Sequence, residues 1–225
     1  MHILVAVDPG KTCGVCIAYT YDKHVYTIYN AYTVVCQSMN KPNEAIKSIY
    51  KHLRELKQQT RQTSSVCITI ERQFWHAPSI RCEAWLTGAA ASMVRTLFAD
   101  GVEIDVRTVQ GKLRLKTPER ILHKSDPERK PIDALDRCKT LSKAARRQRV
   151  KAYAKALLNA IVHQSRVLRF HHPDTRSYLL DPKPSARNHD AIDAMLQLVQ
   201  MVNAQWEPFG PDPPVFSCPP VPHLK

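Results

Sequence analysis

The sequence predicts an α/β domain built on a mixed sheet of five strands that is flanked by helices. Three segments rich in β-branched and aromatic residues follow one another with short turns, which is typical of an antiparallel start. Two more strand-like segments then alternate with segments in which apolar residues recur at helical spacing. The chain has 225 residues, 44% of them apolar, which suffices for one domain with a buried core.

The first half of the chain carries the sheet. The expected strands are residues 2–7, 14–20, 24–35, 66–71 and 102–109. The first is an unbroken apolar run, as expected of a strand buried on both faces, and the last alternates like a half-buried strand. Helices over 42–59 and 78–99 separate the last three strands, so the order is β-β-β-α-β-α-β.

The second half carries the basic residues and further helices. We expect a basic insertion over about 113–147, a helix over 142–163, a proline-containing loop over 167–187 and a helix over 189–203.

The domain organisation follows from composition. The expected domain spans residues 1–206, and residues 207–225 form a proline-rich tail, which is either a ligand for a partner or an inert extension packed on the domain.

The net charge of +13, from 33 basic and 20 acidic residues, indicates an anionic partner. Lys and Arg displace condensed counterions from phosphates, and the excess is concentrated in one stretch, so nucleic acid is favoured over general solubility charge. No apolar run reaches membrane-spanning length. The first strand begins at residue 2 or 3, which leaves no room for a targeting peptide. We therefore expect a soluble intracellular protein.

Two carboxylates end predicted strands. Asp8 follows an apolar run and precedes Pro-Gly, a pattern that also opens ordinary turns. Glu71 ends the strand ITIE, which is apolar enough to be central, so its carboxylate is expected at a sheet edge. Taken alone, each has a structural explanation as a turn residue or a solvated strand end.

Two more carboxylates begin the last helix. Asp190 and Asp193 are three residues apart, so they share a face with Cβ atoms about 5–6 Å apart. The helix dipole accounts for Asp190, but Asp193 stands among apolar residues, where an unpaired charge is costly. Asn188 is expected to cap this helix.

These four acids in a basic chain repel one another unless a cation offsets their charge. Oxygen-only ligands indicate Mg²⁺ or Mn²⁺. Two such ions about 3.5–4 Å apart stabilise the attacking and leaving oxygens of a phosphodiester displacement. The residues therefore predict a nuclease with two metal ions in its site.

Three segments carry a family resemblance. ILVAVDPGKTCGVCIAY, TIERQFWHAPSIRCEAWLTGAAAS and NHDAIDAMLQ resemble the acidic motifs of RuvC-like Holliday-junction resolvases, over roughly residues 2–111 and 142–203. The resemblance implies a ribonuclease H-like fold and a Mg²⁺-dependent endonuclease that resolves four-way DNA junctions in recombination and repair, leaving 5′-phosphate ends. It also implies a homodimer, whose two sites match the pseudo-symmetry of a junction.

The insertion and the tail depart from the bacterial pattern. They suit a viral or a eukaryotic branch. The mitochondrial branch would need a presequence, which the sequence does not show, so a viral branch of the poxvirus type is favoured. That branch implies the host cytoplasm or the site of viral DNA replication.

The resemblance also implies residue roles. Asp8, Glu71, Asp190 and Asp193 would bind metal, with Asp8 bridging the two ions. Lys112 would hold the scissile phosphate, with Arg147 or Lys151 as a second cation; for any one of these, a non-specific phosphate contact or a solvated charge is the alternative. The candidate DNA-binding residues are Phe74, Trp75, Lys112, Arg114, Lys116, Arg146, Arg147, Arg149 and Lys151.

Two features of the sequence have both a functional and a structural explanation. Phe74, or Trp75 with it, could wedge between bases or pack in the core. The segment LTGAAAS resembles the family's dimerisation helix, but its small residues also suit close packing within one subunit.

Three alternatives stay open. A nuclease of this fold could act on RNA–DNA hybrids or flaps, because fold does not fix function. A non-catalytic junction- or RNA-binding module would bind in EDTA and give no products. The C-x-x-C motif of Cys13 and Cys16 lies near Asp8 and offers redox control, although zinc is disfavoured by the lack of a second pair or a nearby His at zinc spacing.

Overall fold

The computed structural model describes residues 1–38, 40–59, 62–72, 77–98, 101–110, 142–165, 167–183 and 188–206, and structural statements below concern these. The strands are β1 (His2–Asp8), β2 (Thr12–Thr20), β3 (Tyr26–Val35), β4 (Ser65–Arg72), β5 (Glu103–Gln110) and β6 (Leu168–Phe170). The helices are α1 (Asn43–Gln59), α2 (Ala77–Leu97), α5 (Lys143–Gln164), α6 (Pro173–Leu180) and α7 (His189–Trp206).

The sheet has the order β5-β4-β1-β2-β3-β6. Strands β1, β2 and β3 form an antiparallel meander. β4 runs parallel to β1 and β5 parallel to β4. The predicted mixed sheet flanked by helices is confirmed, and this arrangement is that of a ribonuclease H-like domain.

A sixth strand extends the expected five. β6 pairs in parallel with β3 at the edge of the sheet, and α6 follows it. Both lie in the segment 167–187, so the prediction of a loop there is wrong. Pro173 occupies the first turn of α6, where its missing N–H and fixed φ do not disturb a helix.

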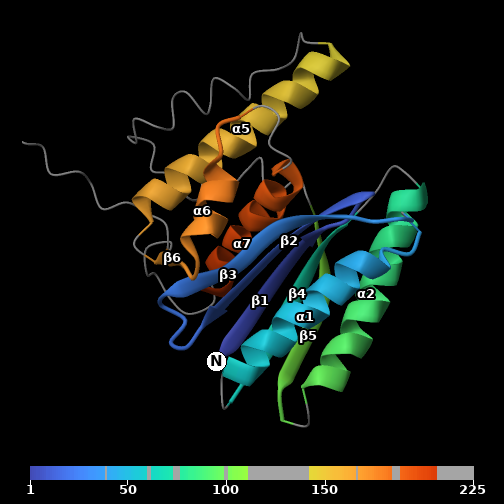
Figure 1. Ribbon diagram of the computed structural model, residues 1–225, viewed down its shortest axis with the longest axis vertical. Coiled ribbons are helices and arrows are strands. Elements are labelled where there is room, and N and C mark those ends of the chain that lie inside the picture. The colour runs from blue at the N-terminus through green and yellow to red at the C-terminus, as the bar shows by residue number, and fades with distance from the viewer. Residues whose placement is uncertain are drawn as a thin grey trace, which may run out of the picture.

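The sheet lies between two helical layers. Figure 1 shows α1 and α2 on one face and α5, α6 and α7 on the other. Because successive strand residues point to opposite faces, Ile3 and Val5 of β1 pack in the α1–α2 core, whereas Leu4 and Ala6 pack in the α5–α7 core. Two apolar cores therefore hold the sheet, one on each face.

Side-chain hydrogen bonds are found at the start of α5 and at the ends of α1 and α2. Ser142 precedes α5 and its Oγ accepts from the Ala145 N–H at 3.3 Å, as an N-cap does. Lys57, near the end of α1, donates to the Leu97 carbonyl at the end of α2.

None of the described helices is long and apolar enough to cross a bilayer.

Candidate functional site

Asp8 and Glu71 end neighbouring parallel strands at the same level. The register of β1 and β4 pairs Val7 with Ile70, so the next residue along each strand is Asp8 or Glu71. Even-numbered residues of β1 and odd-numbered residues of β4 face α7. Asp8 and Glu71 follow this alternation, so both lie on the α7 face of the sheet. Glu71 is 8% exposed. Two of the predicted carboxylates thus share one end and one face of the sheet.

The first turn of α7 lies against the strand beside Asp8. Gly14 of β2 is the register partner of Asp8. A Cβ placed on Gly14 would lie 1.8 Å from the carbonyl oxygen of Asp190 and 2.9 Å from the Ala191 nitrogen. Only glycine permits this approach, so the absence of a side chain at position 14 sets where α7 begins.

A second contact aligns α7 with β4. Gln197 Nε2 donates to Thr69 Oγ1 at 2.9 Å. Glu71 lies two residues beyond Thr69, about 6.6 Å along the strand, and Asp193 lies one turn before Gln197, about 6 Å along the helix. Because α7 runs from the Asp8 end of the sheet toward the opposite end, Asp193 lies on the same side of the Gln197–Thr69 contact as Glu71.

Asn188 joins α6 to the start of α7. Its carbonyl accepts from the Ile192 N–H at 2.8 Å, which is the N-cap position. Its side-chain Nδ2, however, donates to the Tyr178 and Leu179 carbonyls of α6 at 2.7 and 3.3 Å. The expectation that the Asn188 side chain caps α7 is therefore wrong: it caps the end of α6 and is fully buried.

Basic side chains of α5 face the same end of α7. Partial burial lowers the pKa of His189, the nearby Lys151 and Lys155 ammonium groups lower it further, and Asp193 opposes them. Lys155 donates to the Asp181 carbonyl, whereas Lys151 is exposed. Of the predicted DNA-binding residues, Lys151 therefore lies within electrostatic range of His189, the residue before Asp190.

The four carboxylates are not arranged as a metal-binding site in the structure. Within the part of the chain that the structure describes, no group of three or more His, Cys, Asp or Glu side chains is arranged to hold a metal ion. Each of the four acids interacts with another group of the chain. The donors are carboxylate oxygens, the ligands that Mg²⁺ prefers in proteins, so the donor chemistry of the four acids fits a divalent cation.

Other predicted site residues cannot be placed. Phe74, Trp75, Lys112, Arg114 and Lys116 lie outside the described residues, as do residues 113–141 of the insertion and the tail at 207–225. Arg146 and Arg147 are on α5, but their side chains are outside the description, and Arg149 is half-buried.

The C-x-x-C motif does not act as a pair. Cys13 points into the α1–α2 core and Cys16 into the α5–α7 core, because residues three apart on a strand face opposite sides. Cys13 Sγ lies 3.6 Å from Cys36 Sγ, and Cys16 Sγ lies 3.4 Å from Met195 Sδ. Cys13 and Cys16 therefore share neither a metal nor a disulfide.

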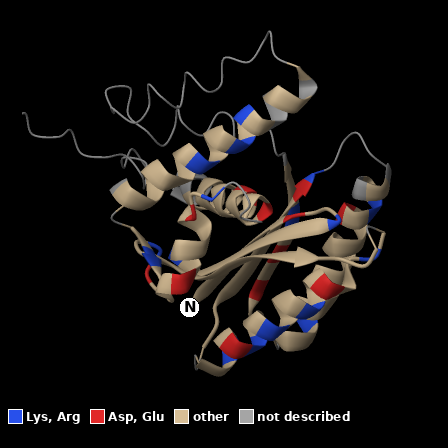
Figure 2. Ribbon diagram, turned by 45° about the horizontal axis from the view of Figure 1, so that its top comes forward, with Lys and Arg blue, Asp and Glu red and all other residues tan. Residues whose placement is uncertain are grey.

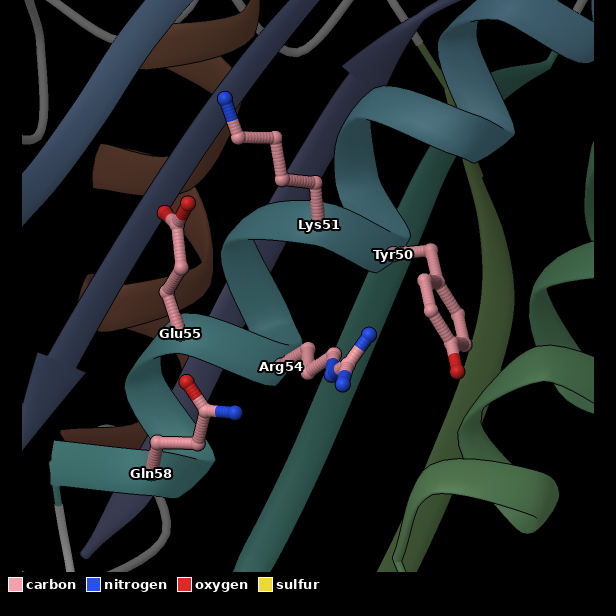
Figure 3. A pocket seen from close by; sticks show the side chains of 5 residues that line it. All are labelled: Tyr50, Lys51, Arg54, Glu55 and Gln58. Atoms are coloured by element: carbon pink, nitrogen blue, oxygen red, sulfur yellow. The ribbon is translucent and has the colours of Figure 1, made fainter.

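A surface hollow of about 290 Å³ lies along α1. Its lining residues are Tyr50, Lys51, Arg54, Glu55 and Gln58. Figure 3 shows that all five side chains come from this one helix. The hollow is on the sheet face opposite α7 and is separate from the carboxylate site.

Sequence reasoning missed the residues that place α7. Gly14 interrupts a β-rich segment, and such a glycine often marks a close backbone approach. Gln197 is a polar residue on the apolar side of the last helix, one turn after Asp193. Those two signals were available; their partners, Asp190 and Thr69, follow only from the folded structure.

Similar known proteins are found by comparison of structures but not by comparison of sequences. No family model matches the sequence, and no curated protein matches it. The chain is similar to T. thermophilus RuvC in complex with Holliday junction substrate, with a TM-score of 0.42, 13% identity, and 92% of this chain and 96% of that chain covered.

Two further solved structures are similar. The Thermus thermophilus RuvC structure gives a TM-score of 0.42 at 15% identity, covering 91% of this chain and 96% of that one. The yeast mitochondrial Holliday junction resolvase Ydc2 gives 0.43 at 11% identity, covering 86% of this chain and 75% of that one. These neighbours are Holliday-junction resolvases, the family that the three motifs resemble. At TM-scores below 0.5 they do not define this chain's activity, which has to follow from its own residues, and the viral branch stays a prediction.

Proposed function

We propose that the protein is a structure-specific DNA endonuclease that resolves four-way junctions with Mg²⁺ or Mn²⁺. The observation that carries this proposal is the double anchoring of α7, by Gly14 at Asp190 and by Thr69 at Gln197. This anchoring supports a shared site, because the first turn of α7 lies against β2 at the register partner of Asp8. The net charge of +13 and the three acidic motifs also favour a nuclease that binds DNA.

The proposed roles follow from donor chemistry. Asp8, Glu71, Asp190 and Asp193 would hold two divalent ions, with Asp8 as the shared ligand. When bound, such ions stabilise the charge that develops on the attacking and leaving oxygens of a phosphodiester. Hydrolysis of this kind leaves 5′-phosphate and 3′-hydroxyl ends.

The basic surface would hold the DNA backbone. Lys and Arg recur along α5 (Figure 2), and the exposed Lys151 is within electrostatic range of His189 at the α7 start. A lysine ammonium binds phosphate as a point charge without reading sequence, which suits an enzyme that recognises branch shape. Lys112 is proposed as a further phosphate contact, and a symmetric dimer would present two sites to the two opposed strands of a junction.

Cleavage of a synthetic four-way junction in Mg²⁺ tests this function. Asp8→Asn, Asp193→Asn and Glu71→Gln should each lower the rate by more than about 100-fold, above the 10–100-fold typical of residues that only support metal ligands. Glu103→Gln is the matched control for Glu71→Gln. Glu103 is exposed and pairs with Ser65 at the other end of β4, so this variant should cut like wild type.

The outcomes separate the alternatives. If the Asp8 and Asp193 variants cut as fast as wild type, the metal-site assignment is wrong. Competition with an RNA–DNA hybrid, a flap and a linear duplex tests the substrate, because a junction resolvase should prefer the junction to all three. Junction binding that persists in EDTA, with no products in Mg²⁺, would instead identify a non-catalytic binding module.

A further inference from the structure

A buried polar bridge joins β4 to α7 beneath the carboxylates. Gln197 Nε2 donates to Thr69 Oγ1 at 2.9 Å, and this hydroxyl donates to Met201 Sδ at 2.9 Å. Thr69 is 0% exposed and Gln197 5% exposed, and their neighbours in the α5–α7 core are apolar. Polar side chains are seldom placed in such a layer unless they have a specific partner or task.

Stability alone does not account for the bridge. Gln197 Oε1 is buried and has no hydrogen-bond partner among the described residues, and a buried acceptor without a donor lowers stability. The Thr69 hydroxyl donates only to a thioether sulfur, which is a weak acceptor. Replacing both partners by apolar side chains of the same shape can leave stability nearly unchanged or raise it, so the bridge contributes geometry rather than net stability.

The bridge fixes how far α7 is advanced along β4. Thr69 is two residues before Glu71 on the same strand face, and Gln197 is one helical turn after Asp193. Sliding α7 along its axis would stretch the 2.9 Å hydrogen bond and shift Asp193 relative to Glu71 in the same direction.

We propose that Thr69 and Gln197 are positioning residues that set the separation of Glu71 and Asp193 for a divalent cation. This inference rests on the proposed metal-dependent site. Residues that orient metal ligands typically change metal affinity by 10–100-fold when they are replaced, even though they touch neither metal nor substrate. A role in packing alone would change stability instead.

Mn²⁺ uptake by the DNA-free protein tests the inference, followed as loss of the free-ion signal in electron paramagnetic resonance. Thr69→Val replaces the hydroxyl with a methyl group of similar shape and should weaken Mn²⁺ binding about tenfold. Thr69→Ser keeps the hydroxyl and should bind Mn²⁺ like wild type. Gln197→Met keeps the chain length without the amide and should weaken binding as Thr69→Val does.

Two controls separate positioning from packing. Met201→Leu removes the sulfur contact but leaves the Gln197–Thr69 hydrogen bond, so Mn²⁺ affinity should not change. Urea unfolding of the double variant Thr69→Val/Gln197→Met should show a midpoint equal to or above that of wild type, because neither the unpartnered oxygen nor a hydroxyl without its donor remains. A lower midpoint with unchanged Mn²⁺ affinity would show that the bridge only packs.

The result that overturns the inference differs from the one that overturns the function. If wild type takes up Mn²⁺ and the folded Thr69→Val and Gln197→Met variants bind it equally well, or if Thr69→Ser loses as much affinity as Thr69→Val, the positioning role is refuted and the metal site stands. If wild type takes up no Mn²⁺, both the positioning role and the proposed metal site are refuted.

Discussion

Gly14 shows how a single missing side chain can place a functional helix. It lies in a strand, where glycine is unfavourable because it leaves nothing to pack. Here the hydrogen in place of a Cβ lets the Asp190 backbone reach the sheet, beside the register partner Asp8. The sequence predicts both acids, since Asp8 ends a recognisable strand and Asp190 begins a recognisable helix. It also predicts that they share a metal site, but it does not predict the contacts that place α7, at Gly14 and at the Thr69–Gln197 bridge.

Gly14→Ala should displace the start of α7. The added methyl would overlap backbone atoms that cannot rotate away, so we expect a loss of about 1–3 kcal/mol in the free energy of unfolding, together with slower junction cleavage. The control is Gly88→Ala in α2, where a Cβ would meet nothing within 4 Å and should stabilise the helix by about 0.5–1 kcal/mol. Urea denaturation at two protein concentrations measures both and separates any effect on dimerisation. Equal stability of Gly14→Ala and wild type would contradict the contact.

His2 should make the fold less stable in mild acid. Burial lowers its pKa, with the Lys23 ammonium and the chain's amino terminus acting the same way. The unfolded state therefore binds a proton more readily than the folded state, so stability is lost as the pH falls below about 6.5. Between pH 7.5 and 5.5, His2→Gln should lose less unfolding free energy than wild type. An equal or larger loss in the variant would mean that His2 does not carry this dependence.

The long elements follow from the sequence to within a few residues, and the short ones do not. The strand expected over 66–71 is Ser65–Arg72, and the helix expected over 142–163 is Lys143–Gln164, because each buries a repeating apolar pattern. β6 has three residues and α6 has eight, too few to show a period. Their presence depends on tertiary contacts such as the pairing of β6 with β3.

Asn188→Ala should loosen the junction of α6 and α7. The variant leaves the Tyr178 and Leu179 carbonyls without their buried donor, which should cost about 1–3 kcal/mol. Asn159→Ala is the control, since Asn159 is exposed on α5 and should change little. Thermal unfolding of the two variants measures the difference. If both melt like wild type, the side chain does not link the helices.

At the scale of the whole molecule, a basic protein concentrates acids at one end of its sheet. The charge of +13 draws in polyanions over the surface, while Asp8, Glu71 and the α7 start occupy the α7 face at the strand ends. In the proposed site, bound divalent cations would relieve their mutual repulsion and let a phosphate approach. Long-range attraction and a local acidic site are thus complementary parts of one proposed nuclease.

The most direct test is a crystal of the wild-type protein soaked in Mn²⁺, with the anomalous signal of the metal recorded. The account predicts Mn²⁺ density between Asp8, Glu71, Asp190 and Asp193, with carboxylate oxygens of both strands and of α7 around it. Well-ordered side chains with no metal density among them, or density held elsewhere by other residues, would contradict it.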